Sequence, residues 1–343
     1  MKNPRWLRTL GVVAAVVIGI VLTLWATAAL YFDLPWPWMR APVAALYFLT
    51  MFSGLLLSRR QFRFLVMPVG FIVVLFWWLA IPPSNNRDWQ KDVDHTAWAD
   101  VDGDRVTVHN LRNCDYRAEF DYTCQWETRT YDLSKLSGFD LAITYWGSPW
   151  IAHPIATFDF GDEGYLPISI ETRKVVGQGY SAIRGFFRQY ELIYLVSDER
   201  DVIRLRTNFR TAEEVYLFHT TATPQRAREI FLDYLQRVNH IHDQPQWYNA
   251  LTNNCTTNIA LAAAESEHKP VNRDWRILLN GKGDQMLYEN HQIVTDGLPL
   301  AELREKAHIN SAARAADNHP DFSQEIRAGR PGFENIVAPT PQN

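Results

Sequence analysis

Three uncharged apolar runs follow one another at the start of the chain. They cover Leu10–Phe32, Ala41–Ser58 and Phe64–Pro83. Each is close to the ~20 helical residues that cross a hydrocarbon core of roughly 30 Å. A buried helix hairpin of a soluble protein is the alternative interpretation, but three such runs in succession favour a membrane domain. We therefore predict three transmembrane helices within residues 1–83.

Basic residues between these runs predict the orientation of the membrane domain. The Lys2–Arg8 segment and the Arg59–Arg63 loop each contain three basic residues, whereas the Asp33–Arg40 loop contains one. Because basic loops stay on the cytoplasmic side, everything after Pro83 is expected outside the cell membrane. The prediction is a multi-pass protein of the bacterial inner membrane, with a cytoplasmic N-terminus and a periplasmic or extracellular C-terminal domain. A signal peptide cleaved near Ala26–Ala28 is the alternative for the first run, and it leaves that domain on the same side.

The polar remainder of the chain alternates strand and helix patterns. Period-two alternation or short apolar runs predict strands at Arg105–His109, Gln125–Tyr131, Leu141–Trp146, His153–Phe160, Tyr165–Thr172 and Val215–Thr220. Gly161–Gly164 places two glycines around two acids, which predicts a turn that joins His153–Phe160 and Tyr165–Thr172 into a hairpin. Ser181–Gln189 is expected to form a short helix that carries Arg184.

Two longer helices have clear start signals. Thr223 and Pro224 are a favourable N-cap and first helical residue, and the apolar spacing that follows is helical up to the region of Pro245. A second helix is predicted from Thr256 onward, with Asn253 or Asn254 as its N-cap. Cys255 then lies in its first turn. Together these elements predict an α+β domain.

Size and charge narrow the function classes. Residues 84–343 suffice for one large domain, which we divide into an N-terminal part (84–136), a central domain (137–316) and a C-terminal tail (317–343). The tail is rich in Pro, Asn and Gly and is expected to be docked or mobile. The formal net charge of −4 gives no indication of a nucleic-acid partner.

The chain has three cysteines. Cys114 and Cys124 are close in sequence, and an oxidising compartment permits a disulfide that would staple a hairpin. This pairing would leave Cys255 as an odd cysteine, which in an exported protein indicates a reactive thiol. The alternative is that all three thiols are free.

Cys255 is the candidate nucleophile. Unpaired N–H groups and the dipole at a helix N-terminus favour the thiolate, which is the nucleophilic form of cysteine. Such a nucleophile needs a base. Among the ten histidines, His153 begins a strand after a loop-like approach, and a histidine at a strand edge facing a helix N-terminus is typical of papain-like thiol enzymes. The other histidines lie in polar segments or, like His219, in an apolar strand.

Hairpin register suggests the group that orients this base. If Gly161–Gly164 is the turn, His153 lies opposite residues near 172, so Glu171 can accept its second ring N–H. Ser169 is a weaker choice. Asp159 lies roughly 20 Å away along the strand, at about 3.3 Å per residue, and is a poor orienter. The alternative for Glu171 is an ordinary exposed acid of a strand.

The residues around Cys255 and His153 resemble those of a known family. Residues from about 137 to 265 resemble the Lnb periplasmic domain, also called DUF4105, whose members are similar to circularly permuted NlpC/P60-like or LRAT-like thiol enzymes. In those enzymes the histidine strand precedes the cysteine helix, as it does here. Family members often have Gly directly before this histidine, whereas this chain has Ala152. The matching positions are the His153 loop and strand, Tyr190–Leu195 with Arg200 and Leu205, and Trp247-Tyr248 through Asn254–Thr257.

The resemblance implies a membrane-bound thiol acyltransferase that acts on a bacterial lipoprotein or another membrane lipid. Cys255 would attack an ester of the diacylglyceryl group and form an acyl-enzyme, and a free amine would then take the acyl chain. His153 would be the general base, Glu171 its orienting partner, and backbone N–H groups near Cys255 the oxyanion hole. Arg184, Tyr248 and Asn254 are the candidate substrate-binding residues. No cofactor or metal motif is recognised, and none is expected.

The same residues are compatible with two other functions. A cysteine hydrolase of the same fold, acting as a peptidase, amidase or lipase, would use the same residues, because transfer and hydrolysis differ in the access of water to the acyl-enzyme. A non-catalytic envelope protein would instead hold Cys255 as a buried structural residue.

Overall fold

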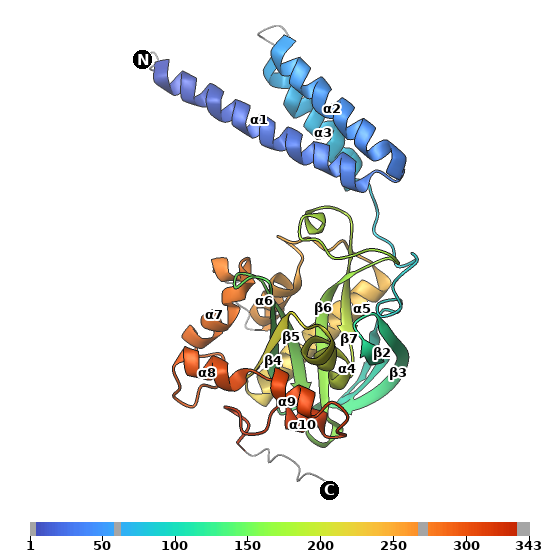
Figure 1. Ribbon diagram of the computed structural model, residues 1–343, viewed down its shortest axis with the longest axis vertical. Coiled ribbons are helices and arrows are strands. Elements are labelled where there is room, and N and C mark those ends of the chain that lie inside the picture. Colours follow the sequence, from blue (N-terminus) through green and yellow to red (C-terminus); the bar gives the residue numbers. More distant parts are fainter. Residues whose placement is uncertain (1–4, 58–62, 267–273, 335–343) are drawn as a thin grey trace. The chain divides into compact units, whose positions relative to one another are not determined.

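The computed structural model describes residues 5–57, 63–266 and 274–334. The described chain forms two compact units (Figure 1). The first, called the membrane unit, comprises Met1–Ser84, Tyr180–Glu191 and Trp247–Asn249. The second, called the soluble unit, comprises Asn85–Gly179, Leu192–Gln246 and Ala250–Asn343.

Three apolar helices build the membrane unit: α1 (Arg5–Asp33), α2 (Pro37–Leu57) and α3 (Arg63–Leu79). The first two are long and apolar enough to cross a membrane. The third has 17 residues, about 25 Å of helix at 1.5 Å per residue, which is short of the ~30 Å of hydrocarbon. Among the described residues, two helices are thus long enough to span a membrane, and not the three that were predicted. The third is short because Pro82 and Pro83 cannot continue a helix and α3 ends at Leu79.

Three of the basic residues that predict the orientation lie outside the described residues, namely Lys2, Arg59 and Arg60.

A polar cluster at Asp33 explains why the helix predicted at Ser181–Gln189 is absent. The Asp33 carboxylate accepts hydrogen bonds from the Arg188 backbone N–H (3.2 Å), the Gln189 amide (2.6 Å) and the Trp78 indole (2.7 Å). Arg188 and Gln189 thus donate to Asp33 and do not extend a local helix, so only the single turn Arg184–Phe186 forms. The prediction of a helix there was wrong because tertiary contacts outweighed local propensity.

The soluble unit contains a three-stranded antiparallel sheet with order β1-β2-β3. Its strands are β1 (Trp98–Asp102), β2 (Arg105–Ala118) and β3 (Asp121–Asp132). Cys114 lies opposite Cys124 across β2 and β3, and the two form a disulfide. The predicted pairing is thus confirmed, and Cys255 is the remaining free cysteine.

A five-stranded sheet with order β7-β6-β5-β4-β8 forms the centre of the soluble unit. Its strands are β4 (Gly138–Trp146), β5 (Ala152–Asp159), β6 (Tyr165–Arg173), β7 (Glu191–Val196) and β8 (Glu213–His219). The predicted hairpin is confirmed, since β5 and β6 are antiparallel, with Ile155 opposite Ser169 and Phe158 opposite Leu166. The mixed α+β class predicted from the sequence is confirmed as well.

Helices cover both faces of this sheet (Figure 1). On one face, α5 (Pro224–Asp243) packs Phe231 and Tyr234 against Phe158, with ring centroids 4.8 and 5.7 Å apart. Its predicted N-cap is confirmed, because the Thr223 hydroxyl accepts from the Arg226 N–H. The other face is covered by α4 (Glu199–Arg204), α9 (Asn310–Ala315) and α10 (Phe322–Glu325), whose apolar residues join those of β4, β5 and β8 in one core.

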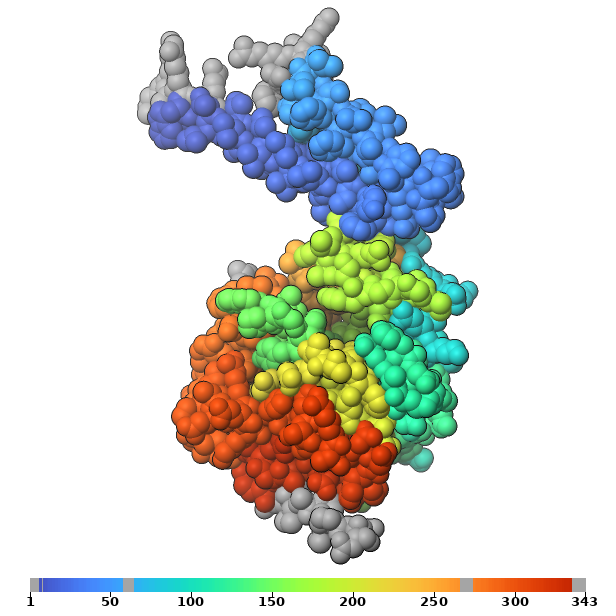
Figure 2. Space-filling view, viewed as in Figure 1, coloured from blue at the N-terminus to red at the C-terminus, as the bar shows by residue number. Residues whose placement is uncertain are grey.

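The described part of the C-terminal tail is docked. Phe322, Ile326 and Phe333 lie in the core beneath the sheet, and in the space-filling view the C-terminal helices lie beside the segment around residues 200–215 (Figure 2). Two further helices, α7 (Gly283–Glu289) and α8 (Leu300–Ala307), precede this segment. The end of the predicted tail, 335–343, lies outside the described residues.

Candidate active site

The helix α6 (Cys255–Ser266) begins at the candidate nucleophile. The Asn254 side-chain oxygen accepts from the Thr257 N–H at 2.9 Å, and the Thr257 hydroxyl accepts from the Asn254 N–H at 2.9 Å. This reciprocal capping satisfies donors that the helix itself cannot pair. The structure therefore assigns Asn254 the N-cap position, which sequence reasoning shared between Asn253 and Asn254, and places Cys255 in the first turn.

The Cys255 thiol is nearly enclosed, with 7 % of the residue exposed. Its sulfur lies 3.8 Å from the Thr256 hydroxyl and 3.8 Å from the side-chain amide nitrogen of Asn280. These neighbours are polar, and the amide presents N–H groups to the sulfur. Such surroundings are chemically unlike the apolar packing of an inert core cysteine.

An interaction with the Cys255 side chain is among the influences that raise the pKa of the His153 imidazole. Its Nε2 atom is 2.8 Å from the Ser169 hydroxyl and 3.0 Å from Oε1 of Glu171, and that hydroxyl donates to the same carboxylate oxygen at 2.7 Å. Because β6 engages Nε2, we infer that Nδ1 is the nitrogen available to the thiol. The structure thus brings together the predicted nucleophile, base and orienting acid.

Arg206 binds the Glu171 carboxylate. Its guanidinium donates to Oε1 of Glu171 at 2.6 Å and to Glu213 at 3.2 Å, and its side chain is 6 % exposed. It lies in η4 (Leu205–Phe209), a π-helical turn in which the N–H of Arg210 reaches the carbonyl of Leu205. Sequence reasoning missed Arg206, since no motif or spacing marks an arginine in such a turn.

Electrostatics hold the His153–Glu171 pair in its charged form. Burial by itself would lower the pKa of His153, but the Glu171 carboxylate and the contact with Cys255 outweigh burial and the opposing charge of Arg206, so the pKa rises to about 9. Burial likewise acts to raise the pKa of Glu171, yet His153 and Arg206 together hold it well below its usual range. At neutral pH the site therefore contains an imidazolium next to a carboxylate.

We expect the His153 ring to titrate with a midpoint of about 9, against 6.5 for an ordinary histidine. Because the folded-state pKa is raised, its contribution to stability is fully present below about pH 6.5 and is lost as the pH rises through 9. NMR of the histidine-labelled full-length protein in detergent measures the midpoint, and His153→Gln assigns the signal. In Glu171→Gln the midpoint should fall below 6.5, because burial then dominates. A wild-type midpoint near 6.5 would contradict this picture.

Arg184 and Tyr248, two of the predicted substrate-binding residues, belong to the membrane unit and not to this cluster. Arg184 is exposed in the turn Arg184–Phe186. Tyr248 is mostly buried, and its backbone N–H donates to the carbonyl of Tyr190 at 3.0 Å. The third such residue, Asn254, uses its side chain as the helix cap. A substrate role stays a prediction for all three.

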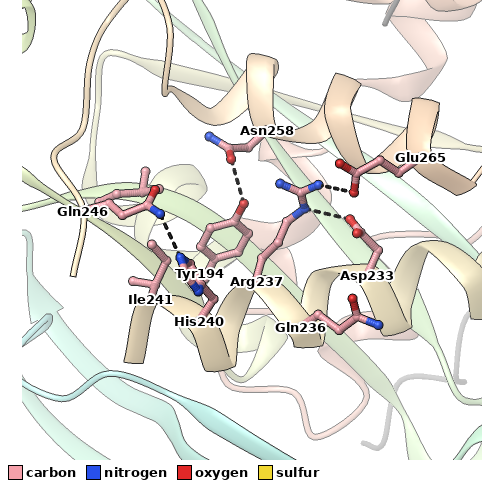
Figure 3. A pocket seen from close by; sticks show the side chains of 10 residues that line it. Tyr194, Asp233, Gln236, Arg237, His240, Ile241, Gln246, Asn258 and Glu265 are labelled. Carbon is pink, nitrogen blue, oxygen red and sulfur yellow. Dashed lines mark hydrogen bonds and ion pairs between the residues drawn. The ribbon is translucent and has the colours of Figure 1, made fainter. Parts of the chain in front are cut away.

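A cavity of about 340 Å³ lies beside α5 and α6 (Figure 3). Its lining includes Tyr194, Asn258 and Arg237, and Arg237 is held between Asp233 (2.7 Å) and Glu265 (2.6 Å). Neither Cys255 nor His153 lines it. Tyr194 also pairs with Asn258, and Gln246 with His240. The arrangement of Cys255, His153 and Glu171 is therefore the better guide to chemistry. Across the described ranges, no group of three or more His, Cys, Asp or Glu side chains is placed to hold a metal ion.

Comparison with known proteins gives a match to one family model. The family model described as the Lnb N-terminal periplasmic domain matches residues 122–281. This range contains the Cys255 thiol, the His153 ring, the Glu171 carboxylate, Arg206 and Asn280. No curated protein and no solved structure gives a significant match.

Proposed function

Because residues 122–281 match the family model of the Lnb N-terminal periplasmic domain, we propose that this protein is a membrane-anchored thiol acyltransferase. It would transfer an acyl chain from the diacylglyceryl group of a bacterial lipoprotein to the free amine of the same lipoprotein. The observation that carries the proposal is the 3.0 Å pair of His153 and Glu171 on the strands β5 and β6, which the helix α6 with Cys255 at its start contacts.

The proposed site fits a circularly permuted NlpC/P60-like arrangement. The histidine strand β5 precedes the cysteine helix α6 in the chain, and α6 contacts both β5 and β6. This order supports a papain-like placement of thiol and imidazole, although one fold can host several acyl chemistries.

The first chemical step would be thioester formation. An imidazolium next to the sulfur stabilises the thiolate of Cys255, which adds to the ester carbonyl carbon and forms a C–S bond. The tetrahedral adduct then collapses, the bond between carbon and glycerol oxygen breaks, and the leaving alkoxide takes the proton from His153. Glu171 keeps the charged ring oriented throughout.

The second step would release the acyl chain to nitrogen. The α-amine of the lipoprotein adds to the thioester carbon while His153, now neutral, accepts a proton from the amine. Collapse breaks the C–S bond and regenerates the thiolate and the imidazolium. The products are an amide and a free glycerol hydroxyl, so atoms and charges balance without a cofactor.

The proposal includes the location. The α1 and α2 helices would anchor the chain in the bacterial inner membrane as a multi-pass protein. The soluble unit would lie on the periplasmic side, where the Cys114–Cys124 disulfide can form.

Mass spectrometry of a synthetic diacylated lipopeptide with a free α-amine tests the function. Incubation with the full-length protein in detergent should leave the lipopeptide mass unchanged and move one acyl chain to the amine, which fragmentation detects. Cys255→Ala should show no transfer. Release of a fatty acid to water would instead identify a lipase. If the wild type leaves both acyl chains of the lipopeptide on the glycerol, the proposal is overturned.

A further inference from the structure

One side chain bridges the histidine strand and the cysteine helix. Asn280 belongs to the single turn η6 (Asn280–Lys282), 128 residues after Ala152. Its side-chain oxygen accepts from the Ala152 backbone N–H at 2.8 Å, directly before His153. Its nitrogen lies 2.8 Å from the Thr256 hydroxyl and 3.8 Å from the sulfur of Cys255.

The orientation of this amide follows from its partners. The backbone N–H of Ala152 can only donate, so the oxygen of Asn280 must face it. The NH₂ group of Asn280 must therefore face α6. One of its two hydrogens serves the Thr256 hydroxyl, and the other is directed to the side of the Cys255 sulfur.

The turn that carries Asn280 is itself fixed against the approach to His153. The Gly281 N–H donates to the carbonyl of Trp150 at 3.0 Å. A Cβ atom on Gly281 would lie 2.4 Å from the carbonyl carbon of Trp150 and 2.6 Å from the nitrogen of Ile151. Only glycine permits this close approach, so η6 and the loop before β5 form one rigid support for Asn280.

We propose that Asn280 is the side-chain donor of the oxyanion hole at Cys255, an assignment that rests on the proposed acyl chemistry. When the thiolate adds to the carbonyl carbon, the π electron pair moves to the carbonyl oxygen, which becomes an oxyanion next to the sulfur. A donor that lies about 2.7–3.1 Å from that oxygen must be farther than this from the sulfur. The 3.8 Å between the Asn280 side-chain nitrogen and the Cys255 sulfur meets this condition.

Backbone donors complete this oxyanion hole. Asn254 occupies the N–H groups of Thr257, through its side chain, and of Asn258, through its carbonyl. The two N–H groups before them, of Cys255 and Thr256, have no partner within the helix. A developing oxyanion at Cys255 therefore meets helix N–H groups and the amide of Asn280.

Two rates measured on the full-length protein in detergent test the assignment. For Asn280→Ala we expect kcat for the diacylated lipopeptide to fall by about 10²–10³-fold with little change in KM, since the donor acts in the transition state. Alkylation of Cys255 by iodoacetamide forms no oxyanion, so its rate should stay within about threefold of wild type. Asn280→Asp, which keeps the shape and loses the donor, should match Asn280→Ala in kcat.

A variant that displaces the turn η6 should change the two rates in a different way from Asn280→Ala. Gly281→Ala forces η6 away from Trp150 and should lower acyl transfer and alkylation together. If Asn280→Ala shows this parallel loss, or keeps kcat within tenfold of wild type, Asn280 is not an oxyanion donor. A wild type that releases fatty acid instead of acylating the amine overturns the proposed function but leaves Asn280 testable on the hydrolysis rate. A wild type with neither reaction overturns both.

Discussion

Replacing His153 with alanine should reduce Cys255-dependent acyl transfer by about 10³-fold or more, while the protein stays folded. The imidazole would hold the proton that the leaving alkoxide takes and would later deprotonate the amine, and a positioned acid–base group commonly contributes 10²–10⁴-fold. Folding should survive because Arg206 and Ser169 still bind Glu171 in the variant, so no buried carboxylate is left unpaired.

A matched control distinguishes this effect from the loss of any histidine–carboxylate pair. His95 pairs with Asp94 at 2.6 Å, but its side chain is half exposed. We expect His95→Ala to keep wild-type transfer rates, whereas Glu171→Gln should fall between His95→Ala and His153→Ala. Initial rates with the diacylated lipopeptide measure all three. If His153→Ala retains more than a tenth of the wild-type rate, the base is another group.

Replacing Arg327 with alanine should lower the free energy of unfolding of the soluble unit by about 3–5 kcal/mol, because removing one partner of a buried ion pair leaves an uncompensated charge. The Arg327 side chain is fully buried and donates to Asp140 at 2.8 Å and to both oxygens of Glu199 at 2.6 and 2.7 Å. Burial raises the pKa of Glu199, and Arg327 opposes that rise.

Thermal unfolding of the full-length protein in detergent, followed by circular dichroism, measures the effect of Arg327→Ala. At about 2–4 °C per kcal/mol for a domain of this size, Tm should fall by roughly 10 °C. Arg228→Ala is the control, since the Arg228–Asp104 pair is partly exposed and should contribute about 1 kcal/mol or less. Equal Tm values for the two variants would show that the buried ion pairs of Arg327 do not stabilise the soluble unit more than an exposed pair does.

Local patterns were sufficient to predict that His153 and Glu171 lie together and that Cys255 lies at the start of a helix. The glycine-flanked turn predicted the β5–β6 register to within one residue. This register placed His153 opposite residues near 172, and polarity then selected Glu171. The capping signal at Asn254 placed Cys255 at the helix start. Both features depend on residues close together in the chain, where turn and cap preferences are strong.

Long-range contacts were beyond sequence reasoning. Asn280 meets Ala152 across 128 residues, and Arg206 meets Glu171 across 35. Neither residue belongs to a periodic pattern or a motif, so nothing local distinguishes it from a surface side chain. The missing helix at Ser181–Gln189 has the same origin, because its backbone is used by Asp33, far earlier in the chain.

If the chain is exported from its N-terminus, as proposed, the docked C-terminal segment sets an order of events. The edge strand β8 is closed by residues made almost a hundred positions later: the Val215 N–H donates to Asn310 at 2.8 Å, and the Ile309 N–H donates to the carbonyl of Val215 at 3.0 Å. In the proposed periplasmic location, Cys255 and His153 would reach the far side of the membrane before the segment that completes the core beneath their sheet. A chain stalled in translocation before Phe322 presents thiol and imidazole on an unfinished scaffold, so secretion itself would delay the onset of activity.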